Sequence, residues 1–264
     1  MQEPLEILGF PTVKLYVAAS EPVAQLAVKL CDVAPDGSSL LVTRGVLNLT
    51  HRHSHEHPTV LIPGEIYPVA IDLSSISHIF AAGHQVRLSI AGADWPLAWP
   101  PPHRTALTLY HDVIHPSHLL LPVIPSRQPV LPTPVFARPD VPVAPARSEA
   151  GPTECTIHHN KVEGTTTVAV RAVSRTDLTE RDLSMSETNE KELSIRENDP
   201  LSCTAEMRRR LEWKRTDWYI TIDSRLRLSC TADTFIVEID LRAQHNSILV
   251  FERRWHEQIP RVLG

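Results

Sequence analysis

A chain of 264 residues with 42% hydrophobic and 22% charged residues is long enough to bury a real core, which excludes wholesale disorder. The formal net charge of −5 is shared along the chain: residues 1–147 carry 9 Lys and Arg against 11 Asp and Glu, and residues 148–264 carry 17 against 20. Neither half offers the basic face needed to bind nucleic acid or an anionic membrane, so neither is expected as a partner.

The four cysteines are widely spaced and form no C-x-x-C pair, so the sequence indicates neither a zinc knuckle nor a redox dithiol. Their even number leaves one disulfide open. The chain opens without the charged, apolar and small-residue segments of a secretion signal, and no apolar run approaches the roughly 20 residues that span a bilayer. We therefore expect reduced thiols in a cytoplasmic protein.

The first part of the chain alternates apolar and polar residues in the manner of β-strands. Val13, Leu15 and Val17 share one face of the first predicted strand, and Pro35-Asp36-Gly37 is typical of a turn. Further strands are predicted over residues 24–33, 39–49, 67–73, 84–92 and 105–111. Many strands at short spacing predict an all-β fold, with a jelly-roll domain, a galactose-binding-like β-sandwich, over residues 1–123.

Proline then dominates the chain. Fourteen of the 23 prolines lie between Pro96 and Pro152, and residues 124–152 show no periodic apolar pattern. Because proline cannot donate a hydrogen bond to a sheet, this segment is predicted to be a linker or an extended strap.

Strand character returns in the last part, which predicts a second β-sandwich-like unit over residues 153–264. Clean alternation occurs over residues 165–173, 205–215, 217–230, 234–243 and 247–255. The polar run 174–198 is predicted to be a long exposed excursion.

Several motifs together resemble one family. They are PLEILGFPTVKLYVAAS (4–20), KLCDVAPDGSSLLVTRGVLNLTHR (29–52), GHQVRLSIAGADWP (83–96) and HPSHLLLPV (115–123). In this order they resemble the C-terminal, non-catalytic domain of the X-prolyl dipeptidyl peptidase and cocaine-esterase-like (CocE/NonD) serine hydrolases. The later pieces NDPLSC (198–203) and VFERRWHEQIPR (250–261) resemble the longer members of the same group.

The resemblance implies an α/β-hydrolase domain that supplies a Ser–His–Asp triad, with the jelly roll closing the rim of the acyl pocket. That catalytic domain would lie before Met1. The chain contains no G-x-S-x-G nucleophile elbow, so we assign no catalytic residue and no cofactor. We expect an accessory chain that is inactive alone. It would either assemble with a separate catalytic chain or be a truncated remnant, and a homo-oligomer is also open.

A metal site is the first alternative. In the run HRHSHEH, the residues His51, His53 and Glu56 come close to the metal motif of cupins, which are jelly rolls too, and histidines two apart project on one side of a strand. The glutamate spacing is one residue short and the second cupin block has no counterpart. A solvated loop is the competing interpretation.

The loop after the strand at residues 84–92 is the candidate rim of a partner's pocket, through Asp94, Trp95 and Trp99. Tryptophans among prolines give large, rigid contact areas, which also suits a carbohydrate- or protein-binding β-sandwich, the second alternative. Trp95 also suits a core position, and Trp99 is the better interface candidate. Arg87 is expected to pair with a carboxylate, for example Asp72 or Asp94, and so to pin a loop.

The run from Arg208 to Arg210 is basic, but Glu206 and Glu212 flank it. A solvated sheet face accounts for this pattern better than phosphate binding does.

Overall fold

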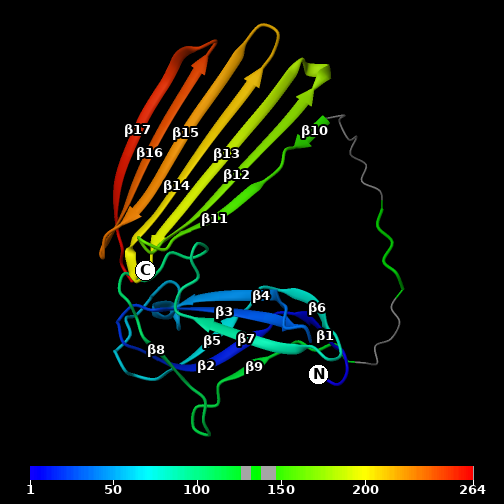
Figure 1. Cartoon of the computed structure of the whole chain (residues 1–264), viewed down its shortest axis with the longest axis vertical. Helices are drawn as coiled ribbons and strands as arrows, with labels where there is room; N and C mark the ends of the chain where they lie inside the picture. Colours follow the sequence, from blue (N-terminus) through cyan, green and yellow to red (C-terminus); the bar gives the residue numbers. More distant parts are fainter. Residues whose placement is uncertain (126–131, 138–146, 264) are drawn as a thin grey trace. The chain divides into compact units, whose positions relative to one another are not determined.

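The computed structural model of the chain describes residues 1–125, 132–137 and 147–263 (Figure 1). The chain divides into two compact units, one formed by Met1–Thr133 with the last two residues and the other by Pro134–Val262. Most of the predicted linker 124–152 lies outside the described residues. Its last part contains a short strand, β10 (Arg147–Ala150). The domain limits 1–123, 124–152 and 153–264 remain a prediction.

The first unit is built from three small antiparallel sheets. One has the strand order β4-β3-β7, the second has the order β5-β2-β8 with β9 also on β2, and β1 pairs with β6. The strands are β1 (Leu5–Gly9), β2 (Thr12–Ala19), β3 (Gln25–Val33), β4 (Ser39–Asn48), β5 (Tyr67–Asp72), β6 (Ile76–Phe80), β7 (Gln85–Ala91), β8 (Leu107–Tyr110) and β9 (His118–Leu120).

Alternation along β2 and β5 creates the core of the first unit. Every second residue of these strands points inward, and the inward side chains join those of β3 in one apolar cluster, so that the sheets face each other across it. The predicted inward face of β2 is confirmed: Val13, Leu15 and Val17 are all buried. Phe80 at the end of β6 is fully buried and lies in the same cluster.

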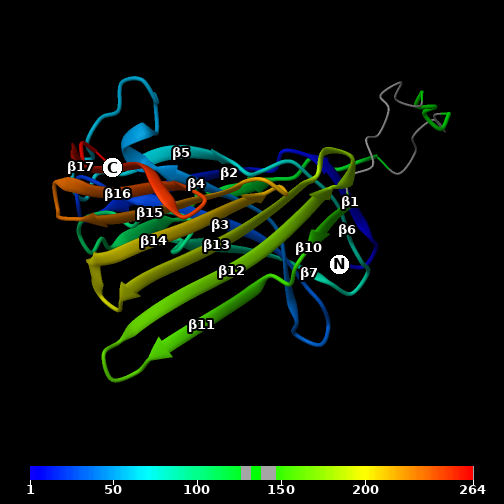
Figure 2. The same cartoon turned by 90° about the horizontal axis from the view of Figure 1, so that it is seen from above.

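The second unit forms one antiparallel sheet of eight strands in the order β10-β12-β13-β14-β15-β16-β17, with β11 also on β12 (Figures 1 and 2). Strand β10 pairs with β12, and from β11 onward each strand pairs with its neighbour in sequence. The bounds are β11 (Glu154–Asn160), β12 (Thr165–Leu178), β13 (Leu183–Arg196), β14 (Asp199–Lys214), β15 (Tyr219–Cys230), β16 (Thr234–His245) and β17 (Ile248–Pro260). The described residues of this unit form this one sheet, and no second layer of the predicted sandwich is among them.

The exposed excursion predicted over residues 174–198 is wrong. These residues form the end of β12, the 3₁₀ helix η2 (Thr179–Arg181) and the whole of β13. Polar residues fall on both sides of β13, for example Glu190 and Lys191, which hides the strand period. The strand forms because both neighbours pair with it along its length.

The register gives this sheet two different faces, since residues opposite each other on neighbouring strands share a face. One row runs Glu190, Arg208, Arg225, Asp240, Arg254, and we call this side the charged face. The adjacent row, on the other side, runs Lys191, Met207, Leu226, Ile239, Trp255, and we call this side the apolar face.

The fold class is therefore confirmed as all-β with several antiparallel sheets, consistent with a β-sandwich. The jelly-roll topology remains a prediction. Within the described residues, no helix is long and apolar enough to cross a membrane.

Candidate functional site

The loop after β7 carries the three residues predicted to form a pocket rim. We call residues 94–102 the tryptophan loop. The carbonyl oxygen of Asp94 accepts hydrogen bonds from the backbone N–H groups of Leu97 at 2.8 Å and Ala98 at 3.0 Å, which closes a tight turn. Three prolines, Pro100 to Pro102, are buried and anchor its far end.

Asp94 is buried at the base of the tryptophan loop, with 6% of its surface exposed. Its Oδ1 atom lies 2.5 Å from Nζ of Lys29, which projects from β3. The ion pair satisfies a carboxylate that would otherwise be costly to bury and fixes the loop to the sheet. Asp94 Oδ2 and Trp95 Nε1 are buried without a hydrogen-bond partner among the described residues. Such groups are normally satisfied by ordered water.

Trp95 and Trp99 pack edge to face, with ring centroids 5.6 Å apart. Both are half-buried, and Leu97 between them is 58% exposed. The loop thus presents a preformed apolar surface whose side chains lose little freedom when they bind a partner. The structure brings all three predicted rim residues into one loop.

The partners expected for Arg87 are used by other residues. Asp94 pairs with Lys29, and Asp72 accepts a hydrogen bond from the Thr12 hydroxyl at 2.8 Å. No ion pair joins Arg87 to Asp72 or Asp94 in the described part of the chain, so the pairing expected between them is wrong. Lys29 was overlooked because only the register of β3 against β7, with Lys29 opposite Ser89, brings it towards the loop.

The histidine run does not form the strand that a metal site of the predicted kind requires. His51 ends the 3₁₀ helix η1 (Leu49–His51), and His53 and Glu56 follow in exposed bends. The Nδ1 atoms of His51 and His55 lie 3.3 Å apart, but the described part of the chain contains no group of three or more His, Cys, Asp or Glu that could hold a metal ion. The run follows the alternative interpretation as a solvated loop.

A second polar cluster, overlooked in the sequence, lies in the first unit around Asp32. This carboxylate is 7% exposed and accepts hydrogen bonds from His78 Nε2 at 2.9 Å and His84 Nδ1 at 2.8 Å. Burial alone would raise the pKa of Asp32, but the two imidazoles more than offset it and hold the pKa below its ordinary value. The cluster ties β3 to β6 and to the turn before β7.

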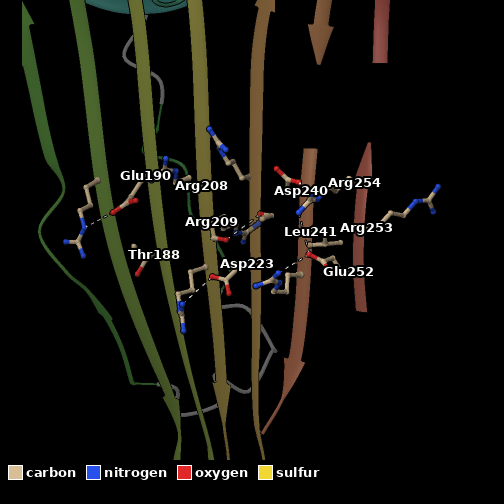
Figure 3. A pocket seen from close by; sticks show the side chains of 15 residues that line it. Thr188, Glu190, Arg208, Arg209, Asp223, Asp240, Leu241, Glu252, Arg253 and Arg254 are labelled. Atoms are coloured by element: carbon tan, nitrogen blue, oxygen red, sulfur yellow. Dashed lines mark hydrogen bonds and ion pairs between the residues drawn. The ribbon is translucent and has the colours of Figure 1, made fainter. Parts of the chain in front are cut away.

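The charged face of the second unit contains a hollow of about 840 Å³ (Figure 3). Arginine and acidic side chains alternate across it: Arg171 lies 3.3 Å from Glu190, Arg242 lies 3.0 Å from Glu252, and Arg254 lies 3.1 Å from Asp240. The charges compensate each other, and a network of ion pairs lines the hollow.

The basic run from Arg208 to Arg210 is part of this network of ion pairs and is not a phosphate site. Arg208 lies 2.6 Å from Glu206, and Arg210 pairs with Asp223 at 3.4 Å. Arg209 points to the other face, where Glu187 is 3.0 Å away. Each guanidinium already has an acidic partner, in agreement with the predicted solvated sheet face.

Comparison with known proteins gives a family match for the first unit. Residues 1–121 match the family described as the X-Pro dipeptidyl-peptidase C-terminal non-catalytic domain. This part of the chain belongs to that family. The match includes the whole tryptophan loop and the Asp32 cluster, and ends before the second unit begins.

Similar full-length proteins are hydrolases. The cocaine esterase of Rhodococcus sp. (strain MB1 Bresler) is 27% identical over 139 residues, which cover 47% of this chain and 24% of the esterase. A crystal structure of an aminopeptidase from a marine sediment Thaumarchaeota archaeon is 21% identical, with a TM-score of 0.46, and an α-amino acid ester hydrolase structure is 25% identical, also at 0.46. Each covers 47% of this chain and 24% of the solved one. The chain spans about a quarter of the length of the curated relatives it matches.

Proposed function

We propose that residues 1–121 act as the accessory, non-catalytic part of a serine hydrolase of the X-Pro dipeptidyl-peptidase or cocaine-esterase type. In this proposal the tryptophan loop completes the rim of the acyl pocket of an α/β-hydrolase catalytic domain or chain. The observation that carries it is the family membership of residues 1–121, because that family is described as non-catalytic.

The geometry of the tryptophan loop supports the choice of surface. The partly buried Lys29–Asp94 pair and the three buried prolines hold the backbone, while the paired rings of Trp95 and Trp99 remain half-exposed. Rigid aromatic anchors of this kind dominate the energetics of many interfaces because little conformational entropy is lost on binding. Asp94 has a positioning role here and would not touch the substrate.

The test is complementation of a truncated relative. The full chain is mixed with the catalytic part of the Rhodococcus cocaine esterase from which the matched C-terminal region has been removed, and both binding and hydrolysis of a p-nitrophenyl ester are measured. The proposal expects a complex and restored hydrolysis. Trp99→Ala should weaken the complex about tenfold, as expected for an aromatic anchor.

The matched control is Trp213→Ala, since Trp213 is a partly exposed tryptophan of the second unit. It should leave the complex unchanged. Absence of a complex with the unaltered chain, or equal loss with both variants, would contradict the proposed rim.

The non-catalytic role has its own test. The full chain alone is treated with a fluorophosphonate probe, which labels activated serines, and is assayed with an ester and a prolyl dipeptide substrate. We expect neither labelling nor turnover. Labelling that disappears when one serine is replaced would refute the accessory role.

A further inference from the structure

The second unit ends in a long strand whose outer edge is open. Strand β17 pairs with β16 on one side and with no other strand among the described residues. It begins with four consecutive apolar residues, Ile248 to Phe251, of which Ile248 is 70% and Val250 61% exposed. Soluble proteins normally protect such edges, because unpaired backbone groups beside apolar side chains recruit another strand.

We propose that the partner of this edge is β17 of a second copy of the chain, paired antiparallel about a two-fold axis at Arg253. The two sheets then continue into one another. This inference concerns the second unit and is independent of the function proposed for the first.

Charge complementarity on the charged face selects this partner and register. A two-fold axis at Arg253 places Glu252 opposite Arg254 of the second copy, and the same pair forms again by symmetry. Within the chain, Asp240 already lies beside Arg254 and Arg242 beside Glu252. The alternation of acidic and basic side chains therefore continues across the junction, since Arg254 of one copy would be followed by Glu252 and then Arg242 of the other.

The apolar face fits in the same register. Phe251 would lie opposite Trp255 of the second copy, and this aromatic pair also occurs twice. The two Arg253 side chains meet at the axis, but each guanidinium already lies over its own Trp255 ring, 4.8 Å from the centroid.

A competing register centred at Trp255 is less favourable. It would place Arg254 opposite His256, which breaks the alternation of charges on the charged face. It would also place Val250 opposite Pro260, which has no N–H group to complete the ladder. The register at Arg253 leaves Pro260 outside the paired segment.

The experiment measures the oligomeric state of the full chain by sedimentation over a series of concentrations. We expect a dimer. The double variant Val250→Lys with Phe251→Lys places lysines on the edge, as natural edge strands do, and should raise the dimer dissociation constant by about tenfold or more. Ile157→Lys is the control, since Ile157 is a 71% exposed residue of β11 at the opposite edge.

The control should not change the dissociation constant. Circular dichroism of each variant checks that the sheet is intact. A chain that stays monomeric at every concentration would overturn the proposal, as would a dimer weakened by Ile157→Lys and not by the β17 lysines.

The register is tested by cross-linking. In a Cys155→Ser background, which removes the exposed native thiol, Arg253→Cys should form a disulfide-linked dimer under oxidised glutathione because the two positions face each other at the axis. Trp255→Cys should not. Cross-linking of Trp255→Cys alone would overturn the pairing at Arg253.

Discussion

The two units use the same antiparallel pairing but stabilise it in different ways. In the first unit the central strand β3 is buried on both faces, and side chains from facing sheets share one apolar cluster. In the second unit the buried residues of the described part are Cys203, Ala205, Thr221 and Arg261. Its charged face depends on ion pairs between neighbouring strands. Long strands can therefore be specified by cross-strand side-chain pairs where a thick core is absent.

The strongest destabilisation is predicted for a substitution in the core of the first unit. Phe80→Ala removes a side chain with 0% exposure and should destabilise this unit by about 3–5 kcal/mol, because it loses burial and leaves a cavity. Urea unfolding monitored by tryptophan fluorescence measures it, because both units contain tryptophans. Ile157→Ala, at an exposed position of the second unit, should change stability by no more than about 0.5 kcal/mol. Equal effects would remove the contrast between the units.

The next effect tests the polar cluster inside the first unit. Asp32→Asn weakens its hydrogen bonds to two imidazoles and should cost about 1–3 kcal/mol at neutral pH. The folded state holds the pKa of Asp32 below its ordinary value of 3.8, so this stabilisation is present above that pH and is lost as the pH falls through the folded pKa. Unfolding curves at several pH values should therefore show the difference from the unaltered protein shrinking below pH 3.8. A constant difference would contradict this explanation.

A smaller destabilisation is predicted for the network of ion pairs in the second unit. Glu206 accepts hydrogen bonds from Arg225 at 2.8 Å and Arg208 at 2.7 Å, and these lower the pKa of its carboxyl. Glu206→Gln should cost about 0.5–1 kcal/mol in dilute buffer and less in high salt, since the pairs are partly exposed. Denaturant unfolding at two salt concentrations measures both. Glu238→Gln is the control, because its contacts with Arg227 at 4.0 Å and His256 at 3.7 Å are both long.

The smallest effect leaves stability untouched and compares two thiols within the second unit. Cys155 is exposed, whereas Cys203 is buried and the burial, with a contribution from Cys230, raises the pKa of its thiol to about 12. Since the thiolate is the reactive form, iodoacetamide should modify Cys155 long before Cys203 at neutral pH. Peptide mass spectrometry gives the order. Rapid labelling of Cys203 would show that its end of the sheet opens.

The sequence predicted the elements whose apolar and polar residues alternate cleanly. The inward residues of β2 and the strands β14 to β17 follow this rule. Strand β13 was overlooked because its residues near Glu190 are polar on both the charged face and the apolar face of the sheet. A period of two in hydrophobicity cannot reveal a strand that carries charges on both faces.

The candidate site was predictable in its residues but not in its contacts. The tryptophan loop could be located from its prolines and aromatic residues, and one of the four motifs that carry the family resemblance, residues 83–96, ends in it. The Lys29–Asp94 pair and the Asp32 cluster join residues 65, 46 and 52 positions apart in the chain. Such pairs depend on strand register, which one sequence does not specify.

Sheet topology also has a consequence for the order in which the two units acquire structure. From β12 to β17, each strand of the second unit meets the one that precedes it through a short connection, such as Glu197–Asn198 or Asn246–Ser247, so the sheet can grow hairpin by hairpin. In the first unit, Tyr16 and Tyr110 must come together from distant parts of the chain before β2 and β8 can pair. Closing so long a loop costs conformational entropy before any stabilising contact forms. We therefore expect the sheet of local hairpins to fold faster than the unit that carries the tryptophan loop.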